Sequence, residues 1–66
     1  FVSPDKMIAE LLSDNQHIAR DQRAAIKITD DNNDTPTSNI LQDLLDGTER
    51  RIWFLFEVSR GGDNEM

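Results

Sequence analysis

Acidic and amide side chains gather in one short stretch, where their oxygen atoms could bind a cation. Asp30, Asn32 and Asp34 alternate along the chain, as the first ligands of an EF-hand calcium loop do. That loop also requires glycine at its sixth position and glutamate at its twelfth. Thr35 and Leu41 stand at those two positions. The stretch is therefore interpreted as a solvated connector between helices, because Asp and Asn favour turns.

Other residues that could do chemistry lack the partners they would need within this chain. His17 is the single histidine and the chain has no cysteine, so a histidine-based metal site or triad has no second member. His17 is interpreted as a surface or hydrogen-bonded residue. Glu10 and Asp14 share one face of a helix, but no histidine stands at the Glu-x-x-His spacing of a di-iron site. No serine or threonine has a base nearby, so the sequence predicts no catalytic residues.

Composition limits the function further. Thirteen acidic and seven basic residues give a net charge of -6, which argues against nucleic-acid binding by charge alone. No apolar run approaches the roughly 18 residues of a membrane span, and no signal peptide opens the chain, so we expect a cytoplasmic protein without a membrane partner. The chain begins at Phe1 rather than Met, from which we expect a part of a longer protein.

A chain of 66 residues is expected to need partners. A domain of this size buries only about 60% of its unfolded surface and is marginal alone. Because the chain has no cysteine, disulfides cannot supply the missing stability, so oligomerisation is expected to supply it.

The spacing of apolar residues predicts two helices and an all-α fold. Ser3, Pro4 and Asp5 form a helix start, with a cap, a first-turn proline and an acidic residue at the positive end of the dipole. Apolar residues then recur three or four apart, which predicts a helix over about 4–29. Asn15 and Gln22 interrupt this stripe and are expected to contact a neighbouring helix.

The acidic stretch is predicted to be a connector over about 30–35, with Asn33 in the left-handed conformation and Thr35 capping the next helix. That second helix is predicted over about 36–58, with a flexible tail over 59–66. Short connectors make helices antiparallel, so the prediction is an antiparallel helical hairpin forming half of a four-helix bundle. Gly47 lies inside the second helix at a cost of about 1 kcal/mol relative to alanine, and a close helix approach would explain it.

Five consecutive apolar residues lie late in the second helix. A helix that packs against one partner needs an apolar stripe and not a belt, so these residues are predicted to lie in an interface with other chains. Trp53 is interpreted as an anchor of a core or interface, with stacking on a ligand as the alternative. The predicted interface residues are Ile52, Trp53, Phe54, Leu55 and Phe56.

An ordered set of motifs resembles the second half of the DNA-protection-during-starvation (Dps) family. Those proteins carry stretches of the form R-x-A-I, G-D-x-x-T-A-D-L-L-T-D and E-K-x-x-W-x-L at similar spacing. The match runs from about Asp5 to Glu57 without gaps. Its members here are Arg23 to Ile26, Asp34, Thr37, Leu41, Asp43, Glu49, Arg50 and Trp53 to Leu55.

The resemblance implies a ferritin-like bundle, of which this chain supplies the last two long helices. The family forms hollow dodecamers that oxidise ferrous iron, store it as ferric mineral and often protect DNA. Its ferroxidase ligands lie in the first two helices, so this chain should lack them, and DNA contact would come only through the assembled parent protein. Asp34 and Asp43 match acidic positions that line the family's three-fold iron pore, whereas Asn39 departs from the usual aspartate.

Two other functions compete with this one. The hairpin could be a small interaction module that dimerises into a four-helix bundle without iron chemistry. It could also be an acidic regulator that mimics nucleic-acid charge, although the acidic residues are scattered over both helices.

Overall fold

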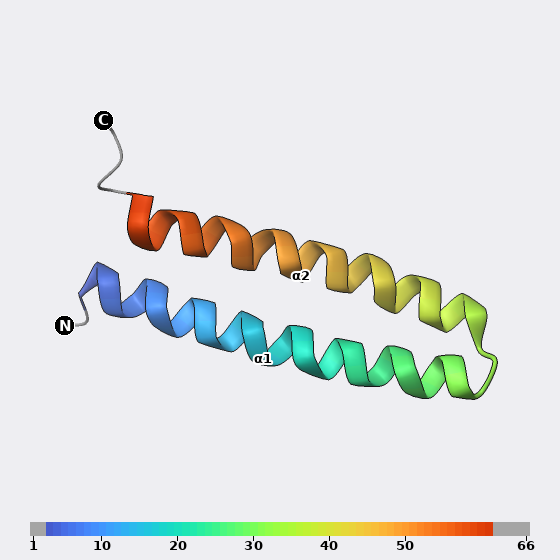
Figure 1. The fold of residues 1–66 in the computed structure, drawn as a ribbon. Coiled ribbons are helices and arrows are strands. Elements are labelled where there is room, and N and C mark those ends of the chain that lie inside the picture. Colours follow the sequence, from blue (N-terminus) through green and yellow to red (C-terminus); the bar gives the residue numbers. More distant parts are fainter. Residues whose placement is uncertain (1–2, 62–66) are drawn as a thin grey trace.

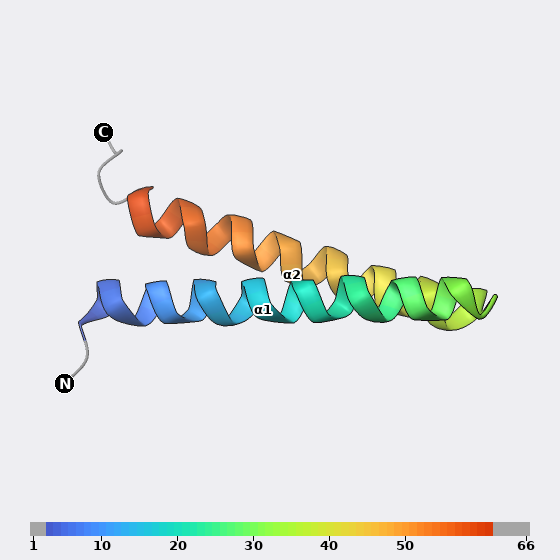
Figure 2. The same cartoon turned by 60° about the horizontal axis from the view of Figure 1, so that its bottom comes forward.

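The computed structural model describes residues 3–61, which form two long helices side by side (Figure 1). Helix α1 spans Pro4–Asp31 and helix α2 spans Thr35–Gly61. They run antiparallel, and the second view shows that α2 diverges from α1 toward its C-terminal end (Figure 2). The predicted all-α antiparallel hairpin is confirmed. Neither helix of this segment is long and apolar enough to cross a membrane.

The connector is shorter than predicted. Helix α1 continues two residues beyond position 29, and Asn32 donates its backbone N–H to the Ile28 carbonyl over 3.1 Å. Asn33 has φ of 59°, as predicted, and this left-handed residue reverses the chain. The backbone N–H of Asp34 then donates to the Thr29 carbonyl over 2.8 Å, which closes the turn.

The cap of α2 lies one residue earlier than predicted. Asp34, not Thr35, caps the helix, because its Oδ1 accepts a hydrogen bond from the backbone N–H of Thr37 over 3.3 Å. Thr35 is already the first helical residue, and Pro36 follows it in the first turn, where its missing N–H costs nothing. The start of α1 is as predicted: Ser3 Oγ accepts from the backbone N–H of Lys6 over 3.2 Å.

The end of α2 also differs from the prediction. The helix continues to Gly61, so residues 59–61 are helical and not part of a tail. Arg60 contributes to this last turn, because its guanidinium carbon lies 5.5 Å from the centre of the Phe56 ring one turn earlier, a cation–π distance. The remainder of the predicted tail, residues 62–66, lies outside the described residues.

The most buried side chains between the two helices are small or polar, apart from Leu45. Ala19 and Thr48 are 1% and 0% exposed, and Leu45 and Ser38 are also buried. Small side chains at the most buried positions let the helix backbones approach each other. Gly47 is not the site of such an approach within this hairpin, because a β-carbon there would meet only the Arg51 Nη1 atom, at 3.8 Å. Within the hairpin, the close approach lies at Ala19 and Thr48.

Hydrogen bonds fix how the two helices are aligned. Arg51 donates from Nε to Asn15 Oδ1 over 3.1 Å and from Nη2 to Thr48 Oγ1 over 3.0 Å. The expected contact of Asn15 with a neighbouring helix is thus confirmed. Near the connector, Ser38 Oγ donates to Asp30 Oδ1 over 2.6 Å. These bonds are exposed or only partly buried, so each contributes modestly, by roughly 0.5–1.5 kcal/mol.

Candidate functional site

Most large apolar side chains of the hairpin face solvent. The whole described unit is a single layer of two helices, with extents of 47 × 27 × 12 Å, so each helix meets only one neighbour. Large exposed apolar area on a small protein marks an interaction surface. The exposed large side chains are Met7, Leu11, Ile18, Ile28, Ile40, Leu44, Trp53, Phe54, Phe56 and Val58.

Most of these side chains lie on one side of the hairpin. Buried Ser38, Leu45 and Thr48 mark the side of α2 that meets α1. Each residue turns the helix by about 100°, which places Ile40, Leu44 and Val58 on one flank of that side and Phe54 at the outer edge of the same flank. Helix positions on this flank recur every three or four residues on both helices, and apolar side chains occupy most but not all of them. We call these residues the bundle face: Met7, Leu11, Ile18, Ala25, Ile40, Leu44, Phe54 and Val58.

The flanks of the two helices lie on the same side because the helices are antiparallel. In each helix, the flank residues lie about 90° from the residues that meet the other helix, in the direction of rotation opposite to that in which the chain winds. Seen from one end, two antiparallel helices wind in opposite senses. Because the helices also face each other, both flanks lie on the same side of the hairpin. The bundle face is therefore continuous across α1 and α2.

The predicted apolar belt divides among three directions. Ile52 and Leu55 turn toward α1 and are half-buried. Phe54, at 64% exposed, belongs to the bundle face, whereas Trp53, at 67% exposed, turns to the other side of the hairpin with Phe56. The hairpin itself does not bury Trp53. A bundle that covers only one side of the hairpin would also leave the indole in solvent, so burial of Trp53 needs a second contact.

The two predicted pore carboxylates are exposed and far apart along one chain. Asp34 caps α2 through its hydrogen bond to Thr37, and Asp43 lies two and a half turns later. At 1.5 Å per residue the two are separated by about 13 Å along the helix. Asp43 turns away from α1. Asp34 and Asp43 could therefore take part in a cation site only together with carboxylates contributed by other chains.

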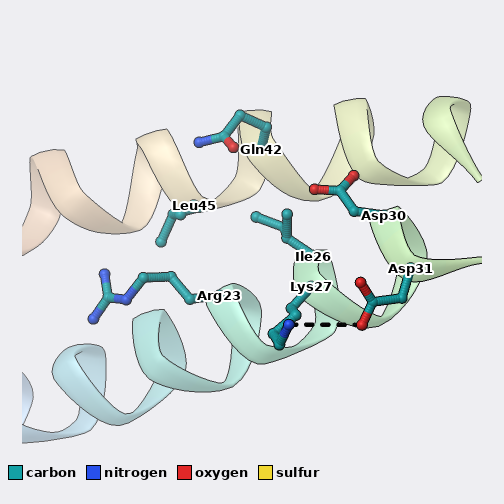
Figure 3. Close-up of a pocket in the computed structure, with 7 residues that line it drawn as sticks. All are labelled: Arg23, Ile26, Lys27, Asp30, Asp31, Gln42 and Leu45. Carbon is teal, nitrogen blue, oxygen red and sulfur yellow. Dashed lines mark ion pairs between the residues drawn. The ribbon is translucent and has the colours of Figure 1, made fainter. Parts of the chain in front are cut away.

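An open hollow of about 490 Å³ lies between the helices near the connector (Figure 3). Charges of both signs line it, and Lys27 Nζ lies 3.7 Å from Asp31 Oδ2. Arg23, at its other end, pairs with Glu49 Oε2 over 3.1 Å. Exposed pairs of this kind contribute little energy, and the pairing leaves no convergent set of groups for catalysis. The lining residues are Arg23, Ile26, Lys27, Asp30, Asp31, Gln42 and Leu45.

The residues present do not fit a di-iron centre. Between residues 3 and 61, no three His, Cys, Asp or Glu side chains come close enough together to hold a metal ion. His17 is exposed and its Nδ1 lies 3.1 Å from Arg20 Nη1, as a surface, hydrogen-bonded histidine should. Asp30 contacts Ser38 and Asp34 caps a helix, so the alternating acidic stretch serves the turn.

Comparison with known proteins identifies one family. The sequence pattern of the family described as Ferritin: Ferritin-like domain matches residues 1–60. No curated protein and no solved structure matches the chain significantly. The match covers both helices and the connector, so it applies to the whole hairpin.

Proposed function

This chain belongs to the ferritin-like family, and we propose that it supplies two helices of a Dps-like bundle that oxidises and stores iron and protects DNA. The observation that carries the proposal is the family match over both helices. The exposed bundle face supports it, because a ferritin-like bundle has four helices and this chain supplies two. A second helix pair, from the same polypeptide or from another copy, would cover that face.

In this proposal, iron is the substrate and the hairpin guides it. The net charge of -6 attracts Fe²⁺ and repels phosphate, so the hairpin itself is not the DNA-binding element. Copies arranged around an axis would repeat Asp34 and Asp43 as rings of carboxylates, and such rings concentrate cations. The ligands that would hold ferrous iron while an external oxidant takes its electron would come from outside residues 3–61.

The proposed iron pore can be tested by removing the charges of Asp34 and Asp43 without disturbing the fold. We expect the double change Asp34→Asn and Asp43→Asn to slow Fe²⁺ uptake by the assembled protein at low ionic strength, because field focusing is lost. The slowing should shrink as salt screens the attraction, with a Debye length of roughly 8 Å at physiological ionic strength. Stopped-flow uptake kinetics over a salt series would measure it.

The structure makes this substitution a clean one. Asparagine caps helices about as well as aspartate, so Asp34→Asn should preserve the hydrogen bond to Thr37. The matched control is Asp5→Asn with Asp46→Asn, which removes the same charge at two other exposed positions. If pore and control variants take up iron at equal rates, Asp34 and Asp43 have no part in the path.

The second candidate is a self-associating interaction module without iron chemistry. The bundle face favours it as well, because burial of that face requires only another helix pair. Both candidates predict assembly, and they differ in the response to Fe²⁺. An assembled protein that neither binds nor oxidises ferrous iron would favour the module.

A further inference from the structure

We propose that the side of the hairpin opposite the bundle face binds an acidic, amphipathic helix of another protein. This side stays in solvent when a second helix pair covers the bundle face. The proposal therefore adds a partner to the four-helix bundle, and it stands independently of iron chemistry. The exposure of Trp53, the sign of the local charge and the spacing of the cations each support it.

This opposite side carries two exposed aromatic side chains. In each helix its residues lie about 90° from those that meet the other helix, in the direction in which the chain winds. Trp53 is 67% exposed and Phe56 is 48% exposed. Aromatic residues are enriched in interfaces, so this pair in solvent marks a contact surface. We call this side the aromatic side, with Arg20, Arg23 and Lys27 on α1 and Trp53, Phe56 and Arg60 on α2.

The charge of the aromatic side has the opposite sign to that of the whole chain. The chain has seven basic and thirteen acidic residues and a net charge of -6. Five of the seven basic residues lie on the aromatic side: Lys6, Arg20, Arg23, Lys27 and Arg60. Among the described residues, the acidic ones on this side are Asp30, Asp31, Asp46 and Glu49. The aromatic side is thus locally positive, and charge complementarity selects an acidic partner.

Three of these cations flank the aromatic rings and have no carboxylate partner among residues 3–61. Lys6 and Arg60 lie at the end of the hairpin away from the connector, and Arg20 lies nearer its middle. Arg60 stacks over Phe56 at 5.5 Å, and Arg20 Nη1 lies 3.1 Å from His17 Nδ1. A partner that covers the rings with apolar side chains would bring its carboxylates to these three cations.

The spacing of the cations indicates that the partner is a helix. Lys6, Arg20 and Lys27 are separated by fourteen and seven residues on α1. They therefore form one row along the edge of the aromatic side, roughly 31 Å long at 1.5 Å per residue. Helices that pack side by side repeat their contacts every seven residues. Glutamates at that interval on the partner would come level with each cation of the row.

The hollow near the connector offers a second place for the partner's apolar side chains. It has a volume of about 490 Å³ and opens on the aromatic side, where half-buried Ile26 and buried Leu45 line it between charged groups (Figure 3). Leu45 and Phe56 are eleven residues apart on α2, or about 16 Å. Residues eleven apart also share one face of a helix. A single partner helix can thus place one apolar side chain in the hollow and another against Phe56.

Nucleic acid is the alternative ligand, because it also combines negative charge with groups that stack on aromatic rings. Its phosphates would extend beyond the aromatic side and meet the rest of a chain whose net charge is -6, which repels them. A short helix can hold its carboxylates on the one edge that faces the cations. The observations therefore favour the acidic helix.

Fluorescence of Trp53 tests the proposal directly. Trp53 is the only tryptophan and the chain has no tyrosine, so the emission reports on the aromatic side alone. The probe is a synthetic helix of about 20 residues, long enough for the row of cations, with a leucine stripe, glutamates along one edge and no aromatic residue. We expect it to shift the Trp53 emission of the assembled protein to shorter wavelength. The same helix with lysine in place of glutamate should bind at least roughly tenfold more weakly.

Two variants locate the contact. Arg20→Glu should weaken binding of the acidic helix by roughly fivefold, with a smaller effect at high salt, because exposed charges are screened. The matched control is Arg50→Glu, which makes the same charge change at an exposed position of α2 that turns away from α1. Trp53→Ala, followed through a dye on the probe, should weaken binding by about tenfold or more, as truncation of an interface anchor does.

Four results would overturn the proposal. Short-wavelength emission of Trp53 in the assembled protein, unmoved by the probe, would show that another copy of the chain covers the aromatic side. Equal binding of the glutamate and lysine helices, or equal effects of Arg20→Glu and Arg50→Glu, would remove the charge argument. Tighter binding of single-stranded oligodeoxythymidine than of the acidic helix would show a nucleic-acid surface. Iron storage is measured without the probe and is unaffected by these outcomes.

Discussion

Leu44→Asp should leave the chain largely unfolded at micromolar concentration. Leu44 is 53% exposed in a single hairpin and lies in the middle of the bundle face. Once that face is covered, the new carboxylate would be buried without a partner, at a cost of about 3–5 kcal/mol. A chain this short has little stability to lose. Circular dichroism should show lost helix, and sedimentation should show lost assembly.

The matched control for Leu44→Asp is Gln42→Asp. It adds the same charge and a similar helix penalty, but Gln42 is exposed beside the charged hollow on the other side of the hairpin. We expect this variant to assemble as the natural chain does. Equal assembly of both variants would show that the bundle face stays in solvent.

Ala19→Leu should destabilise the assembled protein by about 2–3 kcal/mol. Ala19 is 1% exposed and belongs to the same buried layer as Thr48, which is 0% exposed. Extra methylene groups in a filled core force the surrounding structure apart, typically at about 1–3 kcal/mol. Here the added volume would push α1 from α2. Urea denaturation at fixed protein concentration would measure the change.

Ala9→Leu is the control for this overpacking. Ala9 is exposed on α1, and leucine and alanine have similar helix propensities, so the control should change the free energy of unfolding by less than about 0.5 kcal/mol. If Ala19→Leu were as stable as Ala9→Leu, the helices would not pack closely at Ala19.

The hairpin is predictable from the sequence because its signals are local. Apolar residues at helical spacing, the Ser3 cap and the left-handed Asn33 each depend on a few neighbouring residues, and all appear in the structure. The error at the second cap is also local. Asp34 and Thr35 are both good capping residues, and only the backbone geometry after Asn33 decides that the aspartate takes the role.

The packing between helices could not be derived in the same way. The sequence marks Ile52 to Phe56 as apolar, but only the direction in which α2 faces α1 separates Trp53 from Phe54. No sequence signal marks Thr48 as the most buried residue, because its burial depends on the alignment set by Arg51 and Asn15. A regular three- and four-residue interval from Ile40 to Val58 is the available clue to the bundle face.

The candidate site is the least predictable part. Asp34 and Asp43 are candidates through resemblance to a family pattern, and a site made from several chains leaves no geometric trace in one hairpin. In the structure Asp34 caps α2, and a helix start needs such a cap whether or not the protein binds iron. Its proposed role toward iron depends on symmetry that a single chain does not contain.

Sedimentation before and after iron loading would show whether this chain helps to store iron, as we propose. The assembled protein would be given Fe²⁺ and an oxidant, freed of unbound iron and sedimented again. We predict particles of unchanged protein content that sediment faster and carry ferric iron. Ferric hydroxide that precipitates as in protein-free buffer, with the protein sedimenting as before, would contradict iron storage by this assembly.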